Sequence, residues 1–253
     1  MGTRALAESL GLLSQPIKQR QTYLRQKPQH FHYFIVIDFE ATCWEVKSKS
    51  ELGEVIEFPA VLMDGGSGDI VDRFHSYVLP VEHPKLSDFC TTLTGIHQGT
   101  VDDSAPLSNV MSRFLSWLKR VTKERGIVVN PTEEESGKSY ATFVTWSDWD
   151  LGRQLSGECR RKGIFKPAHM NAWVDLRDVY KKYYKKQPKG LNGAMEERCL
   201  VFVGRQHSGI DDAVNTARLL FRLITDGCIV QITTTQSGFL PLFRRDNKRP
   251  RLM

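Results

Sequence analysis

The chain has 253 residues, of which 40% are hydrophobic and 25% are charged, and its formal net charge is +6. This composition is typical of a globular protein and excludes a disordered one. The longest apolar runs, such as Phe34–Ile37 and Ala60–Met63, are far shorter than the roughly 20 residues of a membrane-spanning helix. We therefore expect a soluble protein without a membrane partner.

The N-terminal segment mixes charged and apolar side chains and lacks the apolar core of a secretory signal. We therefore expect an intracellular protein, in the cytoplasm, the nucleus or both. The five cysteines are irregularly spaced and contain no CxxC pair, which predicts reduced thiols rather than a zinc or redox site. Three regions are expected: an N-terminal extension over 1–32, one domain over 33–233 and a basic C-terminal tail over 234–253.

The first half of the domain is predicted to be rich in strands. The run Tyr33–Asp38 is aromatic and β-branched, as in a strand covered on both faces, and it should end near Asp38. Two further strands, Val55–Met63 and Ile70–Leu79, flank the glycine-rich turn 64–69 and form a hairpin. Because no helix separates the first strand from this hairpin, the sheet should begin antiparallel.

The second half alternates helices and strands. Apolar side chains from Leu107 to Val121 recur in steps of three and four, which predicts an amphipathic helix. The segment Lys119–Ser139 loses this periodicity and is expected to be an exposed insertion. Strands are predicted at Tyr140–Trp146 and Ile229–Thr233, and helices at about Asp150–Lys162, Asp175–Lys186, Leu191–Cys199 and Asp211–Thr225. The fold class is therefore α/β, a mixed sheet flanked by helices.

Acidic residues stand where predicted elements end or begin. Asp38 and Glu40 are two residues apart at the end of the first strand, so their side chains should point to the same side. Asp148 and Asp150 follow the strand that ends at Trp146. Any one of these acids could equally cap a helix, because a carboxylate accepts hydrogen bonds from unpaired backbone N–H groups.

The last long helix carries the third acidic position. Asp211 and Asp212 stand at its predicted start, and His207 precedes them. Near neutral pH an imidazole can accept a proton, which suits a general base. A histidine before a helix is also common as an ordinary surface or capping residue. The informative feature is the order along the chain: Asp-x-Glu after a strand, then Asp, then His with an Asp five residues later.

In this order the residues resemble the DEDDh group of 3′-to-5′ exonucleases, which have a ribonuclease H-like (DnaQ-like) fold. The resemblance implies that Asp38, Glu40, Asp150 and Asp212 hold two Mg²⁺ ions, for which Mn²⁺ can substitute, and that His207 is the general base. It further implies that Asp38 bridges the two ions and that Asp150, rather than Asp148, holds the second one. Hard divalent cations prefer such oxygen ligands.

Longer segments are similar to the Eri-type exoribonucleases, a branch of this group that acts on RNA 3′ ends. The similarity runs from about Tyr33 to Ile232, and its motifs are Ile35–Trp44, Glu57–Val61, Leu93–Ile96, Trp149–Asp150 and His207–Asp212. The resemblance implies that single-stranded or stem-loop RNA ends are shortened and that nucleoside 5′-monophosphates are released. Two alternatives stay open: an exonuclease that prefers DNA or accepts both, and a non-catalytic RNA-binding adaptor.

Substrate contacts are predicted in two places. The resemblance implies that Glu40 and Ala41 touch the terminal sugar, that Ile96 packs on the terminal base and that His207 lies at the scissile phosphate. The Leu93–Ile96 segment could also be a plain connector. The stretch 160–189 holds ten basic residues against two acidic ones and could follow RNA phosphates, or simply form a solvated helix face. The sequence does not identify a protein partner.

Overall fold

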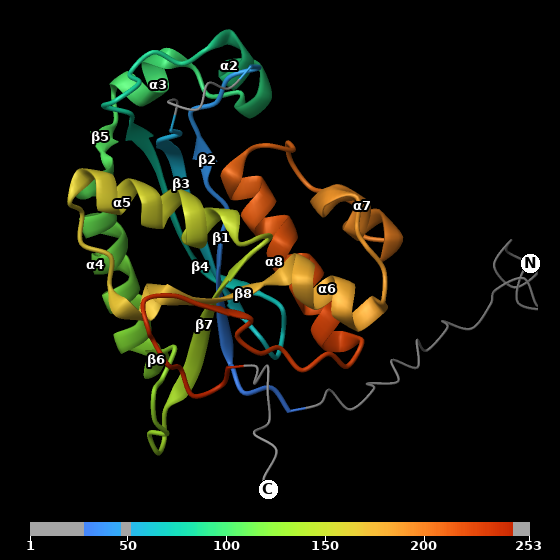
Figure 1. The fold of residues 1–253 in the computed structure, drawn as a ribbon. Coiled ribbons are helices and arrows are strands. Elements are labelled where there is room, and N and C mark those ends of the chain that lie inside the picture. The colour runs from blue at the N-terminus through green and yellow to red at the C-terminus, as the bar shows by residue number, and fades with distance from the viewer. Residues whose placement is uncertain (1–27, 47–51, 245–253) are drawn as a thin grey trace, which may run out of the picture.

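The computed structural model describes residues 28–46 and 52–244. They form one sheet in the order β5-β4-β3-β1-β7-β8-β9, with β2 paired to β3 and β6 to β7 (Figure 1). The strands are β1 (Tyr33–Ile37), β2 (Glu40–Ala41), β3 (Val55–Asp64), β4 (Ile70–Leu79), β5 (Ala105–Pro106), β6 (Ile127–Val129), β7 (Ser139–Thr145), β8 (Ala172–Asp175) and β9 (Thr234–Thr235).

The sheet is mixed, as predicted. β1 lies in its centre, antiparallel to β3 and parallel to β7. The hairpin of β3 and β4 has the predicted bounds to within one residue, and its turn uses Gly68 with a φ of 80°. Because β1 and β7 run in the same direction, the residues that follow both strands emerge at the same edge of the sheet.

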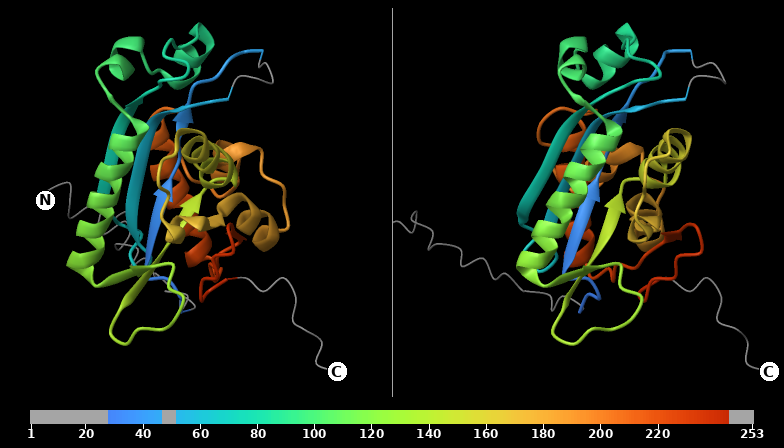
Figure 2. Two further views of the ribbon diagram at one scale, coloured as in Figure 1. Left: turned by 60° about the vertical axis from the view of Figure 1, so that its left-hand side comes forward. Right: turned by 90° about the vertical axis from the view of Figure 1, so that its left-hand side faces the viewer.

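Helices cover both faces of the sheet (Figures 1 and 2). They are α2 (Asp88–Thr94), α3 (Gln98–Asp102), α4 (Leu107–Arg125), α5 (Ser156–Lys162), α6 (Leu176–Tyr184), α7 (Gly190–Glu197) and α8 (Gly209–Thr225), with a π-helical turn η1 (Trp149–Leu155) and a 3-10 turn η2 (Ala168–Asn171). Phe34 and Val36 of β1 pack with α6, α7 and α8. Ile35 and Ile37 pack with α4 and η1 on the other face. The alternation along β1 thus divides the core in two.

Three predicted elements need correction. The segment predicted as an exposed insertion contains the end of α4 and the whole of β6, which pairs in parallel with β7; a three-residue strand is too short to show periodicity. The helix predicted from Asp150 begins as η1 and becomes α-helical only at Ser156. The closing strand lies at Thr234–Thr235, just past the predicted domain end, because these residues pair with β8.

Both flanking regions contact the domain where the structure describes them. Phe31 is 1% exposed and packs against Phe34 and Phe243. Residues 1–27 and 245–253, which include most of the predicted extension and of the basic tail, lie outside the described residues. Within the described ranges, every helix is too short or too polar to cross a membrane.

A buried ion network joins the edge of β3 to α5. Lys162 Nζ lies 2.5 Å from Glu54 Oε1 and 2.6 Å from Glu158 Oε1, and both glutamate side chains are fully buried. Glu54 also accepts hydrogen bonds from the backbone N–H groups of residues 81–83. Lys162, which belongs to the basic stretch, is therefore engaged inside the protein.

Replacing Lys162 with methionine should destabilise the fold by about 3–5 kcal/mol, because it leaves two buried carboxylates without their cation. Urea unfolding monitored by circular dichroism would measure the change. Lys182→Met is the matched control: Lys182 pairs with Asp178 at the surface, with side chains 45% and 33% exposed, so about 0–1 kcal/mol is expected. Equal effects of the two substitutions would contradict this account of the network.

Candidate active site

Two of the predicted acids come from the end of β1. Asp38 directly follows this strand, and Glu40 begins β2, which pairs with β3 so that Glu40 lies opposite Glu57. Asp38 is half-buried and Glu40 is 9% exposed. Both line a cavity of about 550 Å³ at this edge of the sheet. The alternation expected for an extended Asp-x-Glu segment therefore brings both carboxylates to one wall.

Asp150 reaches the same cavity from η1. Its Oδ1 accepts a hydrogen bond of 2.9 Å from the backbone N–H of Phe39, which ties it to the segment between Asp38 and Glu40. Asp148 is directed elsewhere: its Oδ1 accepts hydrogen bonds from Trp173 Nε1 and Thr234 Oγ1, at 2.9 and 2.7 Å. Of the two aspartates, Asp150 therefore lines the cavity, whereas Asp148 binds Trp173 and Thr234.

The carbonyl of Leu151 in η1 accepts hydrogen bonds from two side chains. Ser156 Oγ donates to it at 2.6 Å and Lys166 Nζ at 3.1 Å. Lys166 also lies over the Trp173 ring. These contacts tie the turn that carries Asp150 to Ser156 of α5 and to Lys166.

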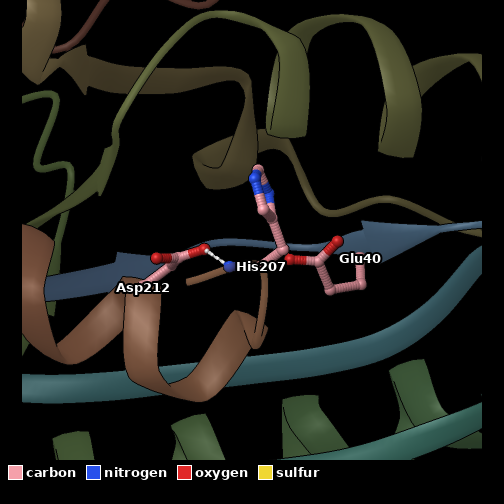
Figure 3. Close-up of side chains that lie close together, drawn as sticks. All are labelled: Glu40, His207 and Asp212. Carbon is pink, nitrogen blue, oxygen red and sulfur yellow. Dashed lines mark hydrogen bonds between the residues drawn. The ribbon is translucent and has the colours of Figure 1, made fainter. Parts of the chain in front are cut away.

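His207 and Asp212 come from the loop before α8 and from its first turn (Figure 3). His207 adopts a left-handed backbone conformation, with a φ of 61°, and its backbone N–H donates to Asp212 Oδ2 at 2.9 Å. Glu40, His207 and Asp212 each have a side-chain atom that could bind a metal ion, and these three atoms lie within 4.8 Å of one another. His207 is exposed, whereas the acids beside it are wholly or partly buried.

The four predicted acids and His207 thus line one cavity, and Ala41 lines it as well. The Leu93–Ile96 segment is divided: Leu93, in α2, lines the cavity, whereas Ile96 is 5% exposed and packs with Ile56, Cys90 and Val101. Leu93 lies in the last turn of α2, whereas Ile96 follows Gly95, whose left-handed conformation ends the helix. The base contact predicted for Ile96 stays a prediction.

The acids repel one another and are poorly solvated. Burial raises the pKa of Glu40 to about 9, with further contributions from Asp212 and Glu57. Burial also raises the pKa of Asp150 to about 7, although the Phe39 N–H partly opposes it, and the pKa of Asp212 to about 7. The pKa of Asp38 is raised as well, by burial and then by Asp150. A divalent cation would relieve this repulsion, and a set of carboxylate oxygens suits such a cation.

Other cavity residues were not predicted as site residues. Trp149 is 39% exposed beside Asp150, and Lys189 lies at the start of α7. Trp149 stood in a sequence motif, but nothing in the sequence indicated that its ring faces the cavity. Within the basic stretch, Arg161 is paired with Glu82, and Lys162 and Lys166 have partners inside the protein. Among the described residues of this stretch, Lys189 is the basic side chain that lines the cavity.

The model of the RNase T exonuclease family matches residues 35–220. The chain therefore belongs to the exonuclease family, whose DEDDh members generally use divalent metal ions. It is 50% identical over 240 residues to ERI1 exoribonuclease 2 of Xenopus laevis, which covers 92% of this chain and 35% of that protein. It is 42% identical to the 3′-5′ exonuclease Snipper of Drosophila melanogaster, covering 85% of this chain and 78% of Snipper.

These relatives place the chain in the Eri-type branch and confirm its resemblance to the Eri-type exoribonucleases. The chain spans about a third of the length of the first of these relatives. The nuclease domain of 3′hExo, a DEDDh family member bound to rAMP, is 32% identical with a TM-score of 0.74, over 83% of this chain and 100% of that one. The ribonuclease H-like fold prediction is confirmed.

The separation of the two aspartates predicts opposite outcomes for two substitutions. Asp150→Asn should abolish RNA cleavage, because it removes a cavity carboxylate. Asp148→Asn should keep most of the activity and lose about 1 kcal/mol of stability, since its contacts are structural. Nuclease assays and thermal melting of both variants would test this. Loss of activity in Asp148→Asn alone would show that the assignment is wrong.

Proposed function

We propose that the chain is a divalent-metal-dependent 3′-to-5′ exoribonuclease that releases nucleoside 5′-monophosphates from RNA 3′ ends. The observation that carries the proposal is the convergence of four carboxylates and one exposed histidine on a single cavity. A binding module has no use for such a cluster, because uncompensated carboxylates repel phosphate. The family membership supports the same conclusion.

Asp38, Glu40, Asp150 and Asp212 would hold the metal ions, for which we propose two Mg²⁺ with Mn²⁺ as a substitute. When bound, such a pair of ions generates a nucleophilic water and neutralises charge on the attacked phosphate and on the leaving oxygen. The raised pKa values of Glu40, Asp150 and Asp212 support this role, because cation binding favours the charged form that burial disfavours.

His207 would accept the proton of the attacking water. Its ring is exposed at the cavity, so water and substrate can reach it, and its backbone N–H is bound to Asp212. This hydrogen bond links the loop that carries the base to a residue that would hold metal. The arrangement keeps the base close to the carboxylates while its imidazole remains available for proton transfer.

The remaining cavity wall is suited to the terminal nucleotides. Glu40 and Ala41 line the cavity, and we propose that they contact the terminal sugar. A contact to its 2′-hydroxyl would favour RNA over DNA. Leu93 and the exposed ring of Trp149 offer apolar surface for a base, and Lys189 offers a cation for a phosphate. We propose these three as substrate contacts in addition to the predicted Ile96.

Incubation with 5′-labelled single-stranded RNA and the matching DNA, in Mg²⁺, Mn²⁺ or EDTA, tests the proposal. We expect a metal-dependent ladder of 3′-shortened RNA, slower degradation of DNA, and at least about a 10²-fold loss in both Glu40→Gln and His207→Ala. RNA binding without cleavage by the unmodified protein would favour the adaptor alternative. Faster degradation of DNA would overturn the RNA preference.

A further inference from the structure

The start of α8 has no capping side chain of its own. Ser208, the residue before the helix, makes no side-chain capping hydrogen bond. The first backbone N–H groups of a helix need acceptors, and they carry partial positive charge. Here the acceptor comes from another element: Glu57 Oε2 accepts from Gly209 N at 2.9 Å, and Glu57 Oε1 accepts from Ile210 N at 3.1 Å.

Glu57 stands between the two halves of the site. It belongs to β3, lies opposite Glu40 in the β2–β3 ladder and is 1% exposed. His75 of β4 approaches the same carboxylate, with Nε2 at 2.8 Å from Glu57 Oε1. A buried carboxylate with three polar partners is fixed in position. One side chain therefore connects the strand pair that carries Glu40 with the helix that carries Asp212.

Close packing at the same point leaves little freedom for α8. A Cβ atom at Gly209 would lie 2.5 Å from the backbone oxygen of Asp38 and 3.1 Å from Pro59 Cγ. The first turn of the helix thus rests directly on the residue that begins the acidic cluster, and only glycine permits this approach. The contact and the Glu57 hydrogen bonds act together on one turn of helix.

We propose that Glu57 is a positioning residue for the reaction, which caps α8 from β3 and thereby sets Asp212 and His207 against Asp38 and Glu40. The inference rests on the proposed exonuclease function. His207 lies two residues before Gly209, and Asp212 lies three residues after Gly209. The backbone N–H of His207 donates a hydrogen bond to Asp212. A small rotation of the first turn would therefore displace both residues together. Displacements of about 1 Å at a reacting centre can lower a rate by about 10²-fold.

The alternative is that Glu57 only stabilises the fold, and Glu54 provides the matched control. Glu54 is also fully buried and also accepts hydrogen bonds from several backbone N–H groups, but those belong to residues 81–83 rather than to α8. In Glu57→Gln, one acceptor oxygen becomes an NH₂ donor, so one of the two α8 amides loses its partner. Glu54→Gln makes the same chemical change away from the helix, where it also removes a carboxylate that pairs with Lys162.

We expect both variants to melt several degrees lower, but only Glu57→Gln to show kcat reduced about 10- to 100-fold with KM for RNA changed less than about 3-fold. Bound Mn²⁺ should raise the melting temperature, and Glu57→Gln should require at least about 10-fold more Mn²⁺ than the unmodified protein for half of the maximal rise. A kcat and a Mn²⁺ requirement equal to those of Glu54→Gln would overturn the proposal.

His75 supplies a milder test that leaves Glu57 intact should Glu57→Gln fail to fold. His75→Leu removes a donor to the carboxylate and should lower kcat about 3- to 10-fold, whereas His75→Gln keeps an N–H donor and should stay within about 2-fold. Equal, unchanged kcat in both would count against the positioning role. If the unmodified protein cleaves no RNA, the proposed function fails, while the Mn²⁺ titrations still decide whether Glu57 and His75 position the acids.

Discussion

Four carboxylates held close together in a poorly solvated cavity are the constraint on which the rest of the structure depends. Burial, with repulsion from Asp212, raises the pKa of Glu40 to about 9, and burial raises the pKa of Asp212 to about 7. Repulsion would move these carboxylates apart unless contacts with the surrounding fold fixed their positions. The Phe39 N–H fixes Asp150, and the His207 N–H fixes Asp212. Two of the four carboxylates, Asp150 and Asp212, are thus held by backbone donors.

The topology explains how these residues meet. β1 lies in the centre of the sheet and runs parallel to β7, so Asp38 and the turn η1 emerge at the same edge. α8 crosses the face of β1 and β3 and brings its first turn to that edge, where Gly209 allows contact with the backbone of Asp38. Each element contributes one or two functional groups, and the long-range packing of the core determines their spacing.

The sequence could predict the acids because their order and spacing survive in the linear chain: Asp38 with Glu40, then Asp150, then His207 with Asp212. Long periodic elements such as α4 were also predictable. The buried members of the basic stretch could not be recognised from the sequence, because their partners depend on the fold. Lys162 pairs with Glu54, more than a hundred residues away, and Lys166 donates to the carbonyl of Leu151. Ile96 could not be placed, since only the last turn of α2 decides which side chain faces the cavity.

With their raised pKa values, the acids of the cluster hold protons near neutral pH and release them to the solvent when a cation binds. For Glu40 the pKa rises from 4.5 to about 9, so the folded protein binds more protons than the unfolded chain between these values, and the metal-free protein loses stability as the pH rises through them. Calorimetric titration with Mn²⁺ at pH 7, in buffers of different ionisation enthalpy, measures the protons released. The account predicts release of roughly one to two protons per protein, falling towards zero above about pH 9. Binding of Mn²⁺ without proton release, or no binding, would contradict it.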